Sequence, residues 1–244
     1  MNARLESTQP AANTVDAEQS IGQIAVQLPG ATAVFRRLKL DFCCGGHLSL
    51  GQATADKNLN LQAVLAELST LQRPAVATEV TEPVALIDHI LERYHAVHRE
   101  QLPELIRMAR RVELVHRENP NVPAGLADTL EAMEHDLLAH MEKEEQILFP
   151  MLKAGGNPFA KQPIRMMRAE HMGHGANLDK VLALTNDATP PQGACNTWRA
   201  LYAGIAQFNE DLLNHIHLEN NVLFPPFEVA APSQGCGSSG CSCG

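Results

Sequence analysis

The sequence has no run of about 18 or more apolar residues, so it predicts no membrane-spanning helix and no membrane partner. Residues 1–20 contain no apolar stretch, so we expect no secretory signal there. Basic residues are few, because 19 Lys and Arg stand against 28 Asp and Glu and leave a net charge of −9. This balance argues against a nucleic-acid partner, since contact with phosphates demands a cationic surface. We therefore expect a cytoplasmic protein.

Cysteine is also scarce, and its distribution does not resemble a disulfide framework for a chain of this size. Two cysteines are adjacent in a glycine-rich loop, one stands alone, and three lie in the Gly/Ser-rich end of the chain. The six residues are Cys43, Cys44, Cys195, Cys236, Cys241 and Cys243. A reducing compartment fits this pattern, in agreement with the cytoplasm.

One motif occurs twice in the chain. Residues 140–150 read HMEKEEQILFP, and residues 215–225 read HIHLENNVLFP. In each copy a glutamate follows the first histidine by four residues, so both side chains lie on one face of a helix. The Leu-Phe-Pro triplet that closes each copy predicts that the helix stops at the proline.

A further histidine precedes each copy at nearly the same distance, His95 before His140 and His171 before His215. Each half therefore predicts two helices in a hairpin, and two such hairpins pack into an antiparallel four-helix bundle. At a rise of about 1.5 Å per residue, the four histidines fall at one depth near one end of the bundle.

Apolar periodicity and the breaks between periodic stretches predict an all-α protein with a small N-terminal helical domain before the bundle. In the small domain we expect helices over 20–28, 31–38 and 61–71, with Asn60 capping the last. In the bundle we expect helices from near Pro83, over 124–152, over 161–185 and over 194–222. The predicted segments are a disordered leader at 1–19, the small domain with its Cys-Cys loop at 20–72, a linker at 73–82, the bundle at 83–228 and a flexible Cys/Gly/Ser tail at 229–244.

The repeated histidines and glutamates predict a metal site. A single histidine on an apolar face is more often structural, but here the whole set recurs in both halves of the chain. Burying these groups without a cation would be costly. Mixed imidazole and carboxylate ligands on facing helices suit non-haem iron, with manganese as the runner-up, and two glutamates suit carboxylates that bridge two ions. The predicted ligands are His95, His140, Glu144, His171, His215 and Glu219.

The two copies, together with RYHAVHREQLPEL and the loop DFCCGGH, closely resemble the RIC (repair of iron centres) family, also called the YtfE/ScdA/NorA type. The resemblance covers residues 20–227. It implies a hemerythrin-like bundle with a non-haem di-iron centre, in which the four histidines are terminal ligands and Glu144 and Glu219 are bridges. It also implies a role under nitrosative and oxidative stress, in restoring damaged iron–sulfur clusters and handling nitric oxide.

A hemerythrin-type site usually has one histidine more than these four. The resemblance offers His116, although an unbroken helix would carry it about 31 Å from His95. His98 and His174, each three residues beyond a predicted ligand, are alternatives as the fifth ligand or as residues that support the ligands. Glu170 is either a surface charge or a group that helps to move ions or protons. The sequence leaves these alternatives open.

Cys43 and Cys44 are candidate redox or iron-transfer thiols, because a thiolate in a glycine-rich loop can be reactive and an adjacent pair can act as a dithiol reductant. The alternative is two small, half-buried packing residues. Cys195 is predicted to be a packing residue. For the cysteines of the tail, metal capture and an unstructured appendage are equally supported.

Three functions fit the sequence. The leading hypothesis is a di-iron stress protein that supplies iron to damaged iron–sulfur proteins, its partners, with nitric oxide as a small ligand. The second is an enzyme that reduces nitric oxide to N2O. The third is a binding protein that senses or buffers NO or O2 without turnover. The sequence leaves the oligomeric state open, with a homodimer as one option.

Overall fold

The structure is a computed structural model that describes residues 15–71, 82–156 and 158–228. Within these residues the regular elements are helices, so the predicted all-α class is confirmed. The chain divides into two compact units, Met1–Glu79 and Val80–Gly244. The predicted tail, most of the predicted linker and residues 1–14 of the predicted leader lie outside the described residues.

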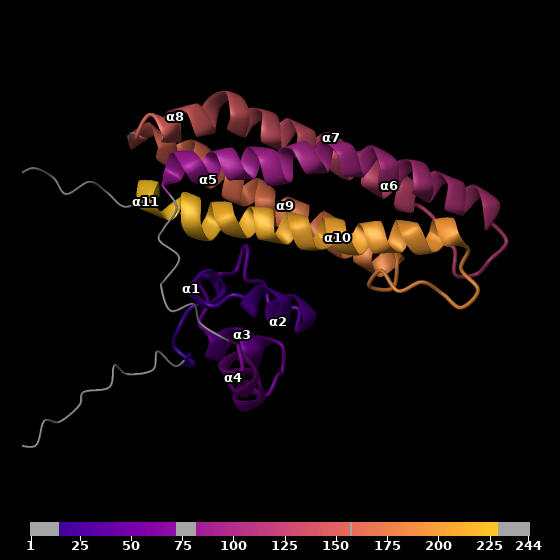
Figure 1. The fold of residues 1–244 in the computed structure, drawn as a ribbon, viewed down its shortest axis with the longest axis horizontal. Coiled ribbons are helices and arrows are strands. Elements are labelled where there is room, and N and C mark those ends of the chain that lie inside the picture. Colours follow the sequence, from indigo (N-terminus) through magenta and orange to yellow (C-terminus); the bar gives the residue numbers. More distant parts are fainter. Residues whose placement is uncertain (1–14, 72–81, 157, 229–244) are drawn as a thin grey trace, which may run out of the picture. The chain divides into compact units, whose positions relative to one another are not determined.

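The N-terminal unit consists of four short helices within the described residues, and three of them begin at a residue whose side chain caps the helix. The helices are α1 (Ile21–Gln27), α2 (Ala31–Arg37), α3 (Leu50–Asp56) and α4 (Leu61–Ser69) (Figure 1). Ser20, Ser49 and Asn60 accept hydrogen bonds from backbone N–H groups in the first turns of α1, α3 and α4. Helix α3 was not predicted, because its sequence, LGQATAD, has too few apolar residues to show a helical period.

The predicted leader extended too far, because residues 15–19 belong to this unit. The backbone N–H of Leu50 donates to the carbonyl of Gln19 (2.8 Å), and that of Gly51 donates to Ala17 (2.8 Å). These bonds satisfy N–H groups at the start of α3 that have no partner inside the helix. Residues 15–19 carry no apolar period of their own, so this pairing could not be predicted from the sequence.

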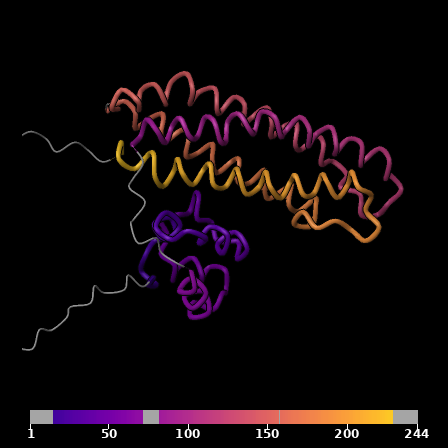
Figure 2. Tube along the Cα trace, viewed as in Figure 1, coloured from indigo at the N-terminus to yellow at the C-terminus, as the bar shows by residue number. Residues whose placement is uncertain are grey.

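The second unit is a bundle of long rods that run antiparallel, side by side (Figures 1 and 2). The first rod joins α5, the π-helical turn η1 and α6, and the second joins α7, the π-turn η2 and α8. After the 3-10 turn η3 comes the third rod, α9, and the fourth joins α10, the π-turn η4 and α11. The bounds are α5 Pro83–Ile90, η1 Leu91–His95, α6 Ala96–Val115, α7 Leu126–Lys143, η2 Glu144–Leu148, α8 Phe149–Lys153, η3 Pro158–Ala160, α9 Lys161–Leu184, α10 Asn196–Leu218, η4 Glu219–Leu223 and α11 Pro225–Glu228.

Three rods contain a π-helical turn, and each turn begins or ends at a residue of the predicted metal site. Turn η1 ends at His95, η2 begins at Glu144 and η4 begins at Glu219. Such turns are rare in helices and are frequent at functional sites. Pro150 does not stop its helix, contrary to the prediction. It lies at one of the first two positions of α8, where proline is tolerated, and the helix continues to Lys153.

The π-turn η1 also shifts the apolar face of the first rod. The helical period predicts Val84 on the inward stripe, but its side chain is 46% exposed, whereas Leu86 and Ile90 are buried. One extra residue in a turn rotates everything before it by about 100°. The stripe therefore changes register at η1. At this end of the bundle a continuous apolar core, which includes Phe149 and Phe224, closes over the site.

Candidate metal centre

The bundle brings all six predicted ligands together, in two groups that share both glutamates. The first group is His95, His215, Glu144 and Glu219, and the second group is His140, His171, Glu144 and Glu219. Within each group the candidate ligand atoms all lie within 4.8 Å of one another. The four histidines therefore lie at one depth in the bundle, as the residue count along the helices predicts.

Glu144 offers one carboxylate oxygen to each group. Its Oε2 lies 3.4 Å from Nε2 of His95, which belongs to the first group. Its Oε1 lies 3.4 Å from Nε2 of His140, which belongs to the second. The carboxylate of Glu144 therefore faces both sets of imidazoles at once.

Glu219 repeats this arrangement from the opposite pair of helices, with Oε1 3.1 Å from Nε2 of His215 and Oε2 3.0 Å from Nε2 of His171. Within a group the two imidazoles also face each other, since the Nε2 atoms of His95 and His215 are 3.2 Å apart. Two ligands held about 2.1 Å from one ion, at roughly right angles, lie about 3 Å apart. The geometry is that of ligands around an ion.

The charges of the site demand cations. Both glutamates are fully buried, and neither oxygen of Glu144 accepts a hydrogen bond from the described residues. Burial and the neighbouring Glu219 act to raise the pKa of Glu144, but His140 and His95 outweigh them and hold it below its usual value. Burial opposes ionisation of Glu219 too, yet His215 and His171 hold its pKa well below normal. Two adjacent buried carboxylates of this kind need positive charge beside them.

The pKa of His140 also shows that the two carboxylates favour positive charge beside them. Burial lowers its pKa, but the carboxylates of Glu144 and Glu219 outweigh burial and raise the pKa to about 9. The carboxylates thus favour a positive charge at the imidazole position, and a bound cation satisfies the same field without a proton. The donor set therefore fits a bound metal cation.

Two of the imidazoles donate to a carboxylate on the side that faces away from the site. Nδ1 of His95 lies 2.7 Å from Glu145 Oε1, and Nδ1 of His140 lies 2.9 Å from Glu170 Oε2. Such partners fix the proton on Nδ1, so that the Nε2 lone pair faces the ion. Glu170, which the sequence left between a surface charge and a role in transfer, is half-buried and also accepts from Lys143 (2.6 Å).

The other two imidazoles are supported differently. Nδ1 of His171 lies 2.9 Å from Oδ1 of Asn220. Nδ1 of His215 has no hydrogen-bond partner among the described residues, and its ring instead stacks on Tyr94, with centroids 5.3 Å apart and planes 3° from parallel. Sequence reasoning missed these partners, although one signal was there: Asn220 directly follows Glu219, and Tyr94 directly precedes His95.

His98 and His174 lie against the two groups as neutral imidazoles. The ring of His98 contacts that of His215 (5.4 Å between centroids), and the ring of His174 contacts that of His140 (4.8 Å). Burial, with the nearby histidines, lowers the pKa of His98 to about 2 and that of His174 to about 3. Both nitrogens of His98 and Nε2 of His174 have no hydrogen-bond partner among the described residues, so either ring offers a lone pair.

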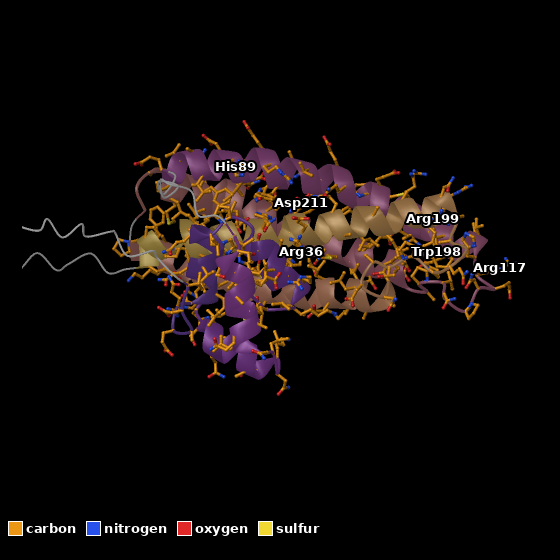
Figure 3. The ribbon with its side chains drawn as sticks, turned by 60° about the horizontal axis from the view of Figure 1, so that its bottom comes forward. Arg36, His89, Arg117, Trp198, Arg199 and Asp211 are labelled. Atoms are coloured by element: carbon orange, nitrogen blue, oxygen red, sulfur yellow. The ribbon has the colours of Figure 1, made fainter. Side chains whose placement is uncertain are left out.

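His116 does not join either group, and the prediction that it supplies a further ligand is wrong for this structure. It follows α6 directly, and its Nε2 lies 3.2 Å from Sγ of Cys195. Since α6 continues unbroken through Pro103, about 30 Å of helix separates His116 from His95. Figure 3 shows Trp198, whose ring contacts His116, at the end of the bundle away from His89.

A cavity of about 320 Å³ adjoins the second group. Its lining includes Lys143, Glu170 and His174, the last two of which contact His140. A small molecule in this cavity would therefore be one side chain away from a predicted ligand.

In the N-terminal unit, Asp41, Cys43 and Cys44 place a carboxylate oxygen and two sulfurs within 4.8 Å of one another. Cys43 is 3% exposed and donates to Asp41 Oδ1 (3.2 Å), and the two sulfurs are 3.9 Å apart. The hydrogen bond with Cys44 and burial raise the pKa of Cys43 well above its usual value, so Cys43 is a thiol at neutral pH. A Cβ atom on Gly45 would lie 2.9 Å from the Asp41 carbonyl, so the loop needs glycine there.

The three cysteines predicted in the tail lie outside the described residues. Among the helices that the structure describes, none combines the length and the apolar character needed to cross a membrane.

Two family models match the chain, one in each unit. Residues 86–227 match the family model of the hemerythrin HHE cation binding domain, so the bundle is of the hemerythrin class. Residues 17–72 match a second model, ScdA_N, described as a domain of unknown function.

Complete relatives extend the match to most of the chain. The chain is 52% identical over 210 residues to the iron-sulfur cluster repair protein YtfE of Yersinia pestis (strain Pestoides F) and to that of Yersinia pseudotuberculosis serotype O:1b (strain IP 31758). Each alignment covers 85% of this chain and 95% of the relative. The chain belongs to the YtfE family of hemerythrin-domain proteins, as the resemblance of its motifs predicts.

Proposed function

We propose that this chain holds two iron ions in the bundle, one in each group. His95 and His215 would hold one ion, His140 and His171 the other, and Glu144 and Glu219 would bridge them. The observation that carries the proposal is that each buried glutamate turns one oxygen to each group. A closed zinc site would need only about four ligands around one ion. Mixed imidazoles and carboxylates on facing helices suit iron better.

The chain's own residues explain how such ions would be kept and released. Partners on Nδ1 hold three of the imidazoles in place, while the apolar core at this end of the bundle excludes water. Bound iron supplies redox chemistry and affinity for nitric oxide. Because the carboxylates are shared, loss of one ion leaves the other still held by two imidazoles and two carboxylate oxygens.

We propose further that the iron serves to repair damaged iron–sulfur clusters, the task named in the relatives at 52% identity. In this function iron is the cargo, and damaged iron–sulfur proteins are the partners. The cluster of Asp41, Cys43 and Cys44 supports a part for the N-terminal unit, since a carboxylate and two sulfurs form a small set of metal ligands. Cys44, which is only half-buried, is the thiol placed to react first.

The test is reactivation of an iron–sulfur enzyme whose cluster has been destroyed by nitric oxide, with thiols and sulfide supplied. Iron-loaded protein should restore activity, and the Glu144→Leu variant should not, because it removes one oxygen from each group. Glu142→Gln, an exposed control two residues away, should behave as the wild type. If Cys43→Ala/Cys44→Ala reactivates as well as the wild type, the thiols have no part in repair.

A second candidate function is the binding or reduction of nitric oxide, which the cavity beside the second group favours. Its lining by His174 gives a small neutral molecule a route to within one side chain of the ligands. Anaerobic nitric oxide added to the ferrous protein separates the cases. Continued production of N2O would identify an enzyme, and uptake of a fixed amount without N2O would identify a binding protein.

A further inference from the structure

A cysteine and a histidine meet at the end of the bundle that carries no predicted ligand. Cys195 is the N-cap residue of α10, and its Sγ lies 3.2 Å from Nε2 of His116, the residue that closes α6. Trp198, in the first turn of α10, packs its ring against the imidazole, with centroids 5.0 Å apart. The imidazole is thus held with one nitrogen on the thiol, and Cys195 is more than the packing residue that the sequence predicts.

This pair opens onto a cavity of about 350 Å³. Arg111 contributes a cation to the lining, Val115 an apolar wall, and Asn196 the first turn of α10. The side chain of the N-cap residue Cys195 makes no capping hydrogen bond, and the first turn of α10, with the positive end of the helix dipole, lines this cavity. The cavity therefore suits a small molecule with negative charge beside the thiol.

We propose that Cys195 is a nucleophilic thiol that forms a mixed disulfide with a small anionic disulfide bound in this cavity. His116, in the tautomer with its proton on Nδ1, accepts the thiol proton on Nε2. The sulfur of Cys195 attacks one sulfur of the disulfide, a new S–S bond forms, and the old one breaks. The departing thiolate takes the proton from His116. Cys195 is oxidised and the departing sulfur is reduced, so no further oxidant is required.

The geometry distinguishes Cys195 from Cys43. Cys43 is buried beside a carboxylate, which disfavours a thiolate, whereas Cys195 is half-buried beside an imidazole, in a cavity that Arg111 also lines. About 30 Å of helix separates His116 from His95, so the reaction at Cys195 does not depend on the metal centre.

Oxidised glutathione, an anionic disulfide, is the probe, and the full-length protein is the substrate. Peptide-resolved mass spectrometry follows the glutathionyl adduct on each cysteine with time at pH 7. We expect Cys195 to be modified well before Cys43. His116→Gln should slow the modification of Cys195 about tenfold or more, because the thiol loses its proton acceptor. His135→Gln, which changes an exposed histidine on α7, is the matched control and should leave the rate unchanged.

Arg111→Ala provides a second test that does not touch the pair. This variant should react more slowly with oxidised glutathione but at the wild-type rate with cystamine, a cationic disulfide. Equal thermal unfolding curves for wild type and variants show that the fold is intact. The proposal is overturned if Cys195 acquires no glutathionyl group, if His116→Gln reacts as fast as the wild type, or if Arg111→Ala slows both disulfides equally.

Discussion

The two groups of the candidate metal centre have the same candidate ligands, which we call the inner side chains. They differ in the outer side chains, which are the residues that contact the imidazoles from behind. Each has two imidazoles and one oxygen from each shared glutamate. On the outer side, the residue before His171 is Glu170, which accepts from His140, and the residue before His95 is Tyr94, which stacks on His215. The repeated sequence thus carries a carboxylate in one half and an aromatic ring in the other, at equivalent places.

This difference indicates that the inner side chains are constrained by charge, whereas the outer side chains are constrained only by the need to hold the imidazoles in place. Two buried carboxylates require the same cationic field on both sides, so the inner set is symmetrical. The outer partners set how firmly each imidazole is held. Tyr94 is itself fixed, because the guanidinium of Arg93 lies 5.0 Å from its ring centroid and donates to Asp211 (2.5 Å). Yet stacking leaves Nδ1 of His215 without an acceptor among the described residues, so we expect the first group to bind its ion more weakly.

The largest effect on iron content should come from changing a shared glutamate, because such a change affects both groups at once. Glu144→Gln deletes the charge that faces both of them. We expect iron content, measured by plasma mass spectrometry, to fall from about two ions per chain to nearly none. Glu142→Gln should retain both ions. A variant that keeps one firmly bound ion would show that Glu144 serves only one group.

Two single variants, each of which removes one imidazole from one group, should distinguish the two ions. His171→Ala should cost the ion of the second group and His215→Ala that of the first, so each variant should retain about one iron per chain. Titration with a chelator should release the remaining ion of His171→Ala at a lower chelator concentration than the remaining ion of His215→Ala, because the ion that remains in His171→Ala lies in the first, weaker group. The reverse order would contradict the assignment of the weaker side.

Changing the outer partners should give a smaller effect. Glu170→Gln keeps the size of the side chain and removes the charge that orients His140, and loss of such a partner typically lowers metal affinity about 10- to 100-fold. Tyr94→Leu removes only a stacking contact, so we expect a smaller decrease, confined to the first group. Competition with a coloured chelator measures both affinities. Equal decreases would mean that stacking and hydrogen bonding support the imidazoles alike.

Acid stability of the metal-free protein should show that His98 and His174, which lie against the two groups, are neutral in the folded state. Their folded pKa values, about 2 and 3, lie below the usual 6.5, so below pH 6.5 only the unfolded chain takes up these protons. Each imidazole should therefore reduce the free energy of unfolding by about 1.4 kcal/mol per pH unit as the pH falls from 6.5. Urea unfolding of wild type and His98→Leu/His174→Leu between pH 5 and 6.5 measures the slope, which should be shallower in the variant.

Much of the centre could be predicted from the sequence, because its inner residues obey helical spacing within a repeated motif. His140 and Glu144 are four residues apart on one rod, and the repeat supplies the same pair on another. The depth of His95 then follows from counting residues along an antiparallel bundle. The all-α class follows from the same periodicity.

The parts that escaped prediction depend on local deviations or on distant contacts. The π-turn at Leu91–His95 changed the register of its rod, which the regular period could not show. The contact of His116 with Cys195 joins residues 79 apart in sequence, and it depends on where α6 ends and α10 begins. Tyr94 reads as an ordinary core residue until its ring is seen on His215.

In the proposed centre, two ions share two carboxylates. The most direct measurement is the Mössbauer spectrum of the purified, iron-loaded protein, recorded with its iron content. Two iron ions per chain, with a spin-coupled, diamagnetic ground state in the oxidised form, are the predicted result. One iron per chain, or two ferric ions that behave as independent paramagnets, would contradict it.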